Sequence, residues 1–236
     1  MELEKKKAAE EAVKWVKNGM VLGLGTGSTV EFMIQALAKL VAKGLQVVGV
    51  PSSERTKELA GNLGIPLTTL DEAGILDLNI DGADEFDSNF RLIKGGGGAL
   101  LREKIIAFNS KVNLIIADST KQVEKLGKFK LPIEVIPFAK KGVLMKLEHM
   151  NLHPVLRLQS GKPFTTDENN LVIDVDIFAI EDVEALNHTL MEIPGVVETG
   201  LFLNLADVIL MGKDSKVLVF ENNSVQTSFR VHTKNT

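Results

Sequence analysis

Short apolar segments alternate with amphipathic segments through the first half of the chain, and this alternation limits the possible folds more than any other feature. The run VLGLG (21–25) has the composition of a buried strand, and STVEFMIQALAKLVAK (28–43) follows it with apolar residues at helical spacing. The same order recurs in LQVVGVPSS and ERTKELAGNLG, and then through DLNIDGAD, RLIKGGGG, LLREKIIAFN and KVNLIIADST. This alternation predicts an α/β fold with a mainly parallel sheet and helices on both faces.

The pattern changes near residue 130. The segments IEVIPF, AKKGVLMKLEHM, HPVLRL, NLVIDVDIF, EDVEALNHTLMEI and VVETGLFL follow in the order βαββαβ, which is typical of a small ferredoxin-like α+β domain. Two short apolar segments, DVILMG and KVLVFE, come last and are expected to return to the first sheet. We therefore expect a Rossmann-like domain formed by residues 1–129 plus 206–236, and a ferredoxin-like α+β domain formed by residues 130–205.

Composition excludes several classes of function. The net charge is −4 and no long basic run is present, so neither nucleic acid nor an anionic membrane is an expected partner. The chain has no cysteine, which excludes disulfides and thiolate catalysis and suits a cytoplasmic protein. The charged, helical N-terminal segment fits neither a signal peptide nor a membrane span. His149 and His153 lack a third ligand at metal-binding spacing, so no metal site is predicted.

The turn GLGTGST (23–29) lies between a predicted strand and a predicted helix. The unpaired backbone N–H groups and the positive dipole at the start of a helix favour a phosphate there. Thr26, Ser28 and Thr29 add hydroxyl donors. The lysine of a P-loop is missing, and the next strand does not end in the acidic residue that a dinucleotide ribose needs. The alternative is a turn required only for close packing, with Ser28 or Thr29 as the helix N-cap.

A second polar cluster follows the apolar segment DLNI. Asp81 and Asp84 come at its end, where the carboxyl ends of parallel strands form a ligand crevice. Lys94 comes ten residues after Asp84, and Gly95–Gly98 follow directly. Four consecutive glycines lose much backbone entropy on folding, so a purely structural turn rarely needs them. Their N–H groups are suited to stabilising a developing oxyanion.

Three further charged residues are candidates for the site. Glu103 lies about a turn and a half into the helix that follows the glycines, although a single glutamate on a helix is usually exposed. Lys121 follows the strand KVNLIIADST, again at the predicted crevice edge. Lys7 belongs to a run of three lysines in the first helix, any of which offers a charge for a phosphate.

Taken together, five segments resemble one known family. They are GLGTGSTV (23–30), DGADE (81–85), KGGGGALLREK (94–104), ADSTK (117–121) and VVETGLF (196–202). This combination resembles ribose-5-phosphate isomerase type A along nearly the whole chain. The resemblance implies an isomerase without metal or other cofactor that interconverts D-ribose 5-phosphate and D-ribulose 5-phosphate through an enediolate. It also implies the non-oxidative pentose phosphate pathway and a homodimer or homotetramer.

The resemblance also implies roles for individual residues. It implies that Glu103 is the catalytic base. A metal-free isomerisation also needs an electrophile for the enediolate oxygen and help in opening the sugar ring. We expect Lys94 with the glycine N–H groups to hold the oxyanion, Asp81 to assist ring opening, and Asp84 to orient Lys94 or the sugar hydroxyls. The implied substrate-binding residues are Thr26, Gly27, Ser28, Thr29, Asp81, Gly82, Ala83, Asp84, Lys94, Gly95, Gly96, Gly97, Lys121 and Lys7.

Other functions remain open on the sequence. A phosphosugar-sensing domain, a sugar-phosphate deaminase and an acyl-CoA-handling transferase all use related architectures. A sensor would normally carry a DNA-binding segment, which the sequence does not reveal. The combination of Lys94, the glycines and Glu103 favours the isomerase.

Overall fold

A computed structural model describes residues 1–222, and the chain in it forms two compact units. The first unit contains residues 1–83, 103–121 and those from 204 onward, and the second contains residues 84–102 and 122–203. Part of the expected Rossmann-like domain, residues 223–236, lies outside the described residues.

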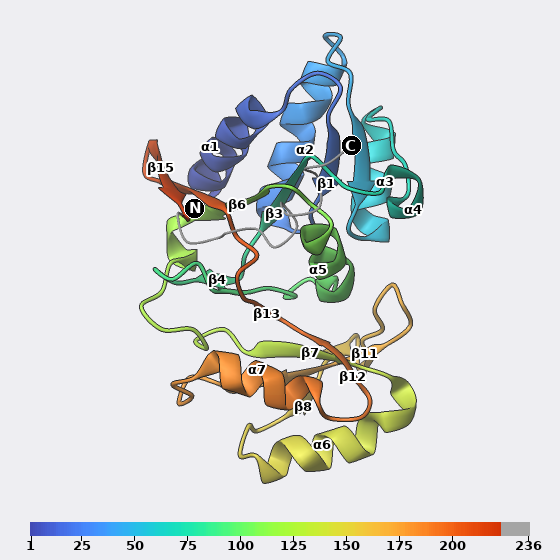
Figure 1. Cartoon of the computed structure of the whole chain (residues 1–236), viewed down its shortest axis with the longest axis vertical. Helices are drawn as coiled ribbons and strands as arrows, with labels where there is room; N and C mark the ends of the chain where they lie inside the picture. The colour runs from blue at the N-terminus through green and yellow to red at the C-terminus, as the bar shows by residue number, and fades with distance from the viewer. Residues whose placement is uncertain (223–236) are drawn as a thin grey trace, which may run out of the picture. The chain divides into compact units, whose positions relative to one another are not determined.

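The first unit is built on a six-stranded sheet (Figure 1). Its strand order is β15-β14-β6-β3-β1-β2. The strands are β1 (Val21–Leu24), β2 (Val48–Pro51), β3 (Leu78–Gly82), β6 (Asn113–Asp118), β14 (Val208–Lys213) and β15 (Lys216–Glu221). Every neighbouring pair is parallel except β14 with β15, which is antiparallel. The prediction of a mainly parallel sheet, to which the last two segments return, is confirmed.

Helices cover both faces of this sheet. They are α1 (Glu2–Ala12), α2 (Ser28–Val41), α3 (Glu54–Asn62), α4 (Leu70–Ala73) and α5 (Leu100–Phe108), with 3-10 turns η1 (Val13–Trp15) and η2 (Ser119–Lys121). Leu22 and Leu24 pack with α1, α2 and α3 in the main core of the unit. On the opposite face, Val50 packs with α4 and with Ile106 of α5. The alternation of side chains along a strand explains why both faces are apolar.

The unit boundary differs from the one expected from the sequence. The segment RLIK was expected to continue the parallel sheet, but β5 (Leu92–Ile93) lies in a separate three-stranded antiparallel sheet with β4 (Glu85–Phe86) and β13 (Leu201–Phe202). The carboxylate of Asp87 accepts N–H bonds from Asn89 and Arg91 and so closes a tight turn between β4 and β5. Residues 84–102 consequently belong to the second unit.

The rest of the second unit has the ferredoxin-like plan that the sequence predicted. Its four-stranded antiparallel sheet has the order β12-β7-β11-β8, so the first strand lies beside the last and the third. The elements of this part of the second unit are β7 (Leu131–Val135), η3 (Pro137–Ala139), α6 (Lys140–His149), β8 (Val155–Leu156), β9 (Leu158–Gln159), β10 (Lys162–Pro163), β11 (Leu171–Val175), α7 (Val183–Met191) and β12 (Val196–Thr199). Strands β9 and β10 pair with each other in a separate two-stranded sheet. Leu131, Ile133 and Val135 alternate along β7 and pack in one core with residues of α6 and α7.

Glu134 is an unusual residue on β7, because it is a carboxylate with only 1% of its surface exposed. Its Oε1 accepts hydrogen bonds from Thr166 Oγ1 at 2.9 Å and from Asn170 Nδ2 at 3.0 Å. Burial raises the pKa of Glu134 above its ordinary value, and these two hydrogen bonds offset only part of that effect. A raised pKa means that the folded state retains its proton at a pH where the unfolded state has lost it.

We expect Glu134→Gln to flatten the pH dependence of stability. Because the folded protein holds this proton more tightly, the wild-type free energy of unfolding falls as pH rises from the ordinary glutamate pKa to the raised one. The variant should lose this contribution, whose slope cannot exceed about 1.4 kcal/mol per pH unit for a single proton. Urea unfolding between pH 4 and 8 measures it. The exposed Glu148→Gln controls for the loss of one negative charge, and equal slopes in all three proteins would contradict the expectation.

Candidate active site

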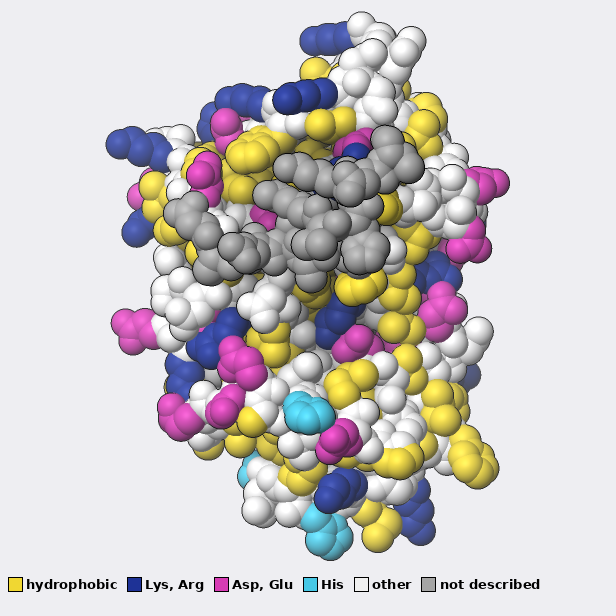
Figure 2. Space-filling model, viewed as in Figure 1, with side chains coloured by type: hydrophobic (Ala, Val, Ile, Leu, Met, Phe, Trp, Pro, Cys, Tyr) yellow, Lys and Arg dark blue, Asp and Glu magenta, His cyan; other side chains and the backbone are white. Residues whose placement is uncertain are grey.

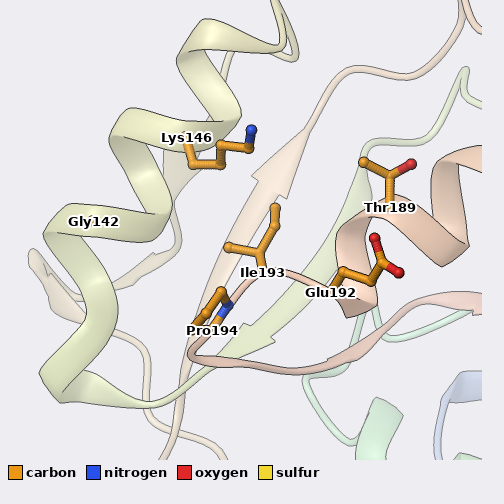
Figure 3. Close-up of a pocket in the computed structure, with 6 residues that line it drawn as sticks. All are labelled: Gly142, Lys146, Thr189, Glu192, Ile193 and Pro194. Carbon is orange, nitrogen blue, oxygen red and sulfur yellow. The ribbon is translucent and has the colours of Figure 1, made fainter.

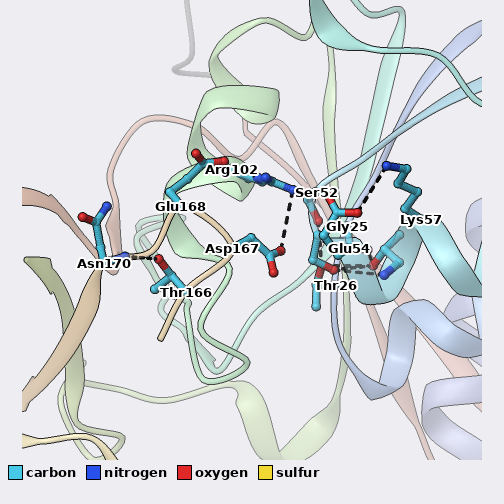
Figure 4. Close-up of polar contacts among 12 residues, drawn as sticks. Gly25, Thr26, Ser52, Glu54, Lys57, Arg102, Thr166, Asp167, Glu168 and Asn170 are labelled. Carbon is cyan, nitrogen blue, oxygen red and sulfur yellow. Dashed lines mark hydrogen bonds and ion pairs between the residues drawn. The ribbon is translucent and has the colours of Figure 1, made fainter. Parts of the chain in front are cut away.

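In the first unit, the GTGST turn (25–29) carries a network of hydroxyl groups at the carboxyl ends of β1 and β2. Thr26 Oγ1 lies 2.8 Å from Ser52 Oγ, 2.8 Å from Ser53 Oγ and 3.0 Å from Thr56 Oγ1. Figure 4 shows Thr26 beside Ser52 and Gly25 in this network. Gly27 has a φ of 131° at the N-cap of α2, a conformation that L side chains rarely adopt. The turn therefore places backbone N–H groups and hydroxyls at a helix start, where an anion is favoured.

Asp81 is fixed at the carboxyl end of the neighbouring strand, β3. It is 1% exposed, and its Oδ1 accepts the Thr26 N–H at 3.1 Å and the Gly82 N–H at 2.7 Å. Gly25 makes this approach possible, because a Cβ at that position would lie 2.1 Å from Asp81 Oδ1. The structure thus brings the GTGST turn and the first aspartate of DGAD together.

The run of lysines in α1 reaches this turn through Lys5. Its Nζ donates a hydrogen bond to Ser28 Oγ at 2.9 Å. Lys7 Nζ lies 3.9 Å from Glu10 Oε2. Lys7 also lines a separate cavity with Lys14 and Val217. Sequence reasoning named Lys7 but left open which of the three lysines contacts a phosphate, because the run does not show which of them faces the turn. The structure favours Lys5 as the cationic neighbour of the GTGST turn.

Glu103 and Lys121 occupy different environments in the first unit. Glu103 lies in the first turn of α5 and is 3% exposed, so it is not the solvated helix residue that the alternative interpretation described. Lys121 ends η2 and is partly exposed. It follows β6, whose last residue, the buried Asp118, accepts the N–H of Thr120 at 3.0 Å.

In the second unit, Gly95–Gly98 form a tight turn, here called the glycine turn. The Gly98 N–H donates to the Gly95 carbonyl at 2.9 Å, and both glycines have a positive φ, 97° at Gly95 and 79° at Gly98. Gly96 and Gly97 are exposed, whereas Gly95 and Gly98 are buried. The run of glycines thus presents two of its residues on an accessible surface.

Asp84 and Lys94 adjoin the glycine turn. Asp84 Oδ2 accepts the Gly96 N–H at 2.7 Å, and a Cβ at position 96 would lie 2.6 Å from Asp84 Oδ1. Lys94 is 3% exposed, with its Nζ 5.3 Å from the centre of the Phe202 ring. Asp84 therefore contacts the glycine backbone directly, which the sequence did not predict.

Sequence reasoning missed the hydroxyl groups around Thr26, which are those of Ser52, Ser53 and Thr56. A signal was present, because PSS ends the second predicted strand and the carboxyl ends of neighbouring parallel strands meet at one sheet edge. Ser53 also caps α3, since its Oγ accepts the Thr56 N–H at 3.0 Å. These hydroxyls hold the GTGST turn in place.

One further hollow in the second unit lies away from these residues. A cavity of about 490 Å³ is lined by side chains of α6 and α7 and by the segment after α7 (Figure 3). Two of its polar lining residues have partners elsewhere: Thr189 Oγ1 donates to the Ala185 carbonyl, and Glu192 Oε1 lies 3.7 Å from His188 Nε2. We assign no site to it.

Neither the charges on the face shown in Figure 2 nor the metal-binding groups of residues 1–222 mark a different site. On the face shown in Figure 2, acidic and basic side chains are interspersed rather than gathered by sign. Across residues 1–222, no cluster of three or more His, Asp or Glu side chains is arranged to hold a metal ion. Over the same residues, no helix has the length and apolar character needed to cross a bilayer.

The fold is that of an α/β protein in which hydroxyl groups and the buried Asp81 carboxylate lie at the carboxyl ends of parallel strands, the sheet edge where proteins of this class bind their ligands. The comparisons with known proteins narrow this class. The sequence profile of ribose 5-phosphate isomerase A (phosphoriboisomerase A) matches residues 48–216. The chain therefore belongs to the ribose 5-phosphate isomerase A family.

Individual relatives agree over nearly the whole chain. Ribose-5-phosphate isomerase A of Parvibaculum lavamentivorans is 48% identical over 92% of this chain and 97% of its own length. The solved ribose 5-phosphate isomerase A of Methanocaldococcus jannaschii is 43% identical, with a TM-score of 0.88 over 92% of this chain and 98% of its own. A solved D-ribose-5-phosphate isomerase in complex with phospho-erythronic acid is 40% identical, with a TM-score of 0.89 over 92% of this chain and 97% of its own.

Proposed function

We propose that this protein interconverts D-ribose 5-phosphate and D-ribulose 5-phosphate by proton transfer through an enediolate, without a metal ion. The observation that carries the proposal is the 40% identical isomerase in complex with phospho-erythronic acid. That ligand combines a phosphate with a carboxylate, and a carboxylate has the planar, two-oxygen charge distribution of an enediolate. The proposal includes a role in the non-oxidative pentose phosphate pathway, a cytoplasmic location and a homodimer or homotetramer.

The proposed chemistry assigns a task to each group. Glu103 removes the proton from C2 of the open-chain aldose and returns it to C1. Because the Glu103 side chain is shielded from solvent, its environment favours this proton transfer. Lys94 and the glycine turn stabilise the negative charge that develops on the substrate's oxygen as the enediolate forms. Asp81 assists the opening of the sugar ring. Asp84, through its bond to the Gly96 N–H, sets the orientation of that peptide group.

The GTGST turn is the proposed phosphate site. Its backbone N–H groups lie at the start of α2, and Ser28 and Thr29 contribute hydroxyls. Lys5 adds a positive charge at Ser28, as its hydrogen bond shows. Lys121 is proposed as a further substrate contact at the end of β6. The remaining binding residues predicted from the sequence, Gly82, Ala83 and Gly97, stay proposals.

We expect Lys5→Ala to raise KM for ribose 5-phosphate by about 10- to 150-fold, since a charged hydrogen bond contributes about 1.5–3 kcal/mol. Lys7→Ala is the matched control, because it removes the same charge from the same helix without touching Ser28. Initial rates of ketose formation measure both variants. Equal KM values in the two variants would contradict the assignment of Lys5.

A substrate panel tests the function itself. The protein is treated with a chelator and incubated separately with ribose 5-phosphate, an amino sugar phosphate and an acyl-CoA with a carboxylate acceptor, while NMR follows each mixture. We expect conversion only of ribose 5-phosphate. Release of ammonia would support the deaminase, and acyl transfer would support the transferase. Calorimetric binding of ribose 5-phosphate without conversion would support the sensor.

A further inference from the structure

The second unit contains a partly buried ion pair that touches the glycine turn. Arg157 follows β8, and Asp174 lies on β11, the strand beside it (Figure 1). Arg157 Nε donates to Asp174 Oδ2 at 2.9 Å, and Arg157 Nη2 donates to Asp174 Oδ1. The side chains of the pair are only 16% and 18% exposed. This bidentate contact fixes the plane of the guanidinium group.

The remaining nitrogen of Arg157 is directed at the backbone of the glycine turn. Its Nη1 donates to the Gly95 carbonyl at 2.9 Å and to the Gly96 carbonyl at 3.2 Å. Phe164 supports the arrangement, because its ring centre lies 5.9 Å from the guanidinium carbon and a Cβ at Gly98 would come within 2.3 Å of the ring. The glycine turn is therefore held by residues that lie about 60 positions later in the sequence.

The contact fixes the direction of the glycine N–H groups. In a trans peptide the C=O and N–H bonds point in opposite directions, so a carbonyl held by Arg157 turns the following N–H away from it. The N–H groups concerned are those of Gly96 and Gly97. The first of them donates to Asp84, so the Gly95–Gly96 peptide is held at both ends. The positive charge on the carbonyl side also polarises each peptide and makes its N–H a stronger donor.

We propose that Arg157, held by Asp174, is a positioning residue that orients and polarises the glycine turn for stabilising the enediolate. This inference rests on the proposed function. Arg157 acts through the Gly96 peptide, whose N–H is held by Asp84, and through the Gly97 peptide, whose N–H is the donor turned toward the enediolate, and not on the substrate. Lysine cannot replace it fully, because an ammonium group lacks the planar fork that binds Asp174 and the two carbonyls together.

The test compares Arg157→Met with Arg91→Met. Arg91 forms a similar, partly buried pair with Asp87 in the same unit, and Asp87 is 2% exposed. We expect Arg157→Met to lower kcat about 10- to 100-fold, with KM changed less than about threefold, because it misaligns oxyanion donors. The kcat of Arg157→Lys should lie between that of Arg157→Met and that of the wild type. Arg91→Met should keep kcat within about twofold of the wild type.

A second measurement is independent of activity. In ¹H–¹⁵N spectra, the amide signals of Gly96 and Gly97 should move in Arg157→Met and stay in place in Arg91→Met. A kcat within about twofold of the wild type in folded Arg157→Met, equal kcat losses in both variants, or unmoved glycine signals would overturn the inference. An inactive wild-type protein would instead overturn the proposed function, while the glycine signals would still report whether Arg157 orients the turn.

Discussion

Replacing Glu103 by glutamine should lower kcat by a factor of about 100 to 10,000, which is the usual contribution of a positioned general base. Glutamine has nearly the same shape as glutamate, so the buried position should stay packed. KM for ribose 5-phosphate should change little, because the carboxylate acts in the proton transfer rather than in phosphate binding. Steady-state rates of ketose formation and urea unfolding, measured on the same preparation, separate loss of chemistry from loss of fold.

Glu58→Gln is the control for this experiment. Glu58 lies on the exposed surface of α3 in the same unit, so its variant removes one negative charge without disturbing a buried site. It should keep the wild-type kcat. If Glu103→Gln were as active as Glu58→Gln, Glu103 would have no place in the mechanism, and the base would have to be sought among the other carboxylates.

The second large effect is expected at Gly25, the first residue of the GTGST turn, whose N–H donates to the Ile80 carbonyl at 3.0 Å. In Gly25→Ala, the new Cβ would lie 2.1 Å from Asp81 Oδ1 and 2.6 Å from Asp81 Cα. Because one of these atoms belongs to the backbone, the ends of β1 and β3 must separate, and the bond from Thr26 N to Asp81 must lengthen or break. We expect a loss of about 1–3 kcal/mol in the free energy of unfolding, as for other overpacked sites.

The same separation displaces the GTGST turn from Asp81. A misplacement of about 1 Å costs roughly 100-fold in catalysis, so kcat/KM should fall by about that factor even in the fraction that remains folded. Gly61→Ala is the control: a Cβ there would meet Leu67 at 3.9 Å, and alanine favours the helix by about 1 kcal/mol. A near-normal kcat/KM in Gly25→Ala would contradict the expectation that separating the ends of β1 and β3 displaces the GTGST turn.

The parts of the fold that depend on local pattern were predictable. The strands around VLGLG and LIIAD show continuous apolar runs, and the helix STVEFMIQALAKLV shows helical spacing, so the parallel sheet follows from nearby residues. The candidate site residues at the ends of these strands, such as Thr26 and Asp81, follow from the same reasoning. The βαββαβ order of the second unit was likewise predictable from local sequence patterns.

The parts that depend on distant pairing were not predictable. The segment RLIK has the composition of a parallel strand, but β5 pairs with β13, more than a hundred residues later. Gly200 lies between β12 and β13. A Cβ there would lie 2.4 Å from the Lys94 carbonyl, so glycine allows the close approach of this segment to the end of β5. The choice of Lys5 over Lys7 depends on how α1 is rotated on the sheet. The contact of Arg157 with the glycine turn likewise depends on tertiary structure alone.

The most direct test of the account follows the proton itself. Chelator-treated wild-type protein is incubated with ribose 5-phosphate in deuterated water, and NMR follows both ketose formation and the label at C1. Proton transfer through an enediolate predicts conversion to ribulose 5-phosphate with deuterium entering at C1 over repeated turnovers. Conversion without any label at C1 would contradict proton exchange by a carboxylate base, and the absence of conversion would contradict the isomerase function.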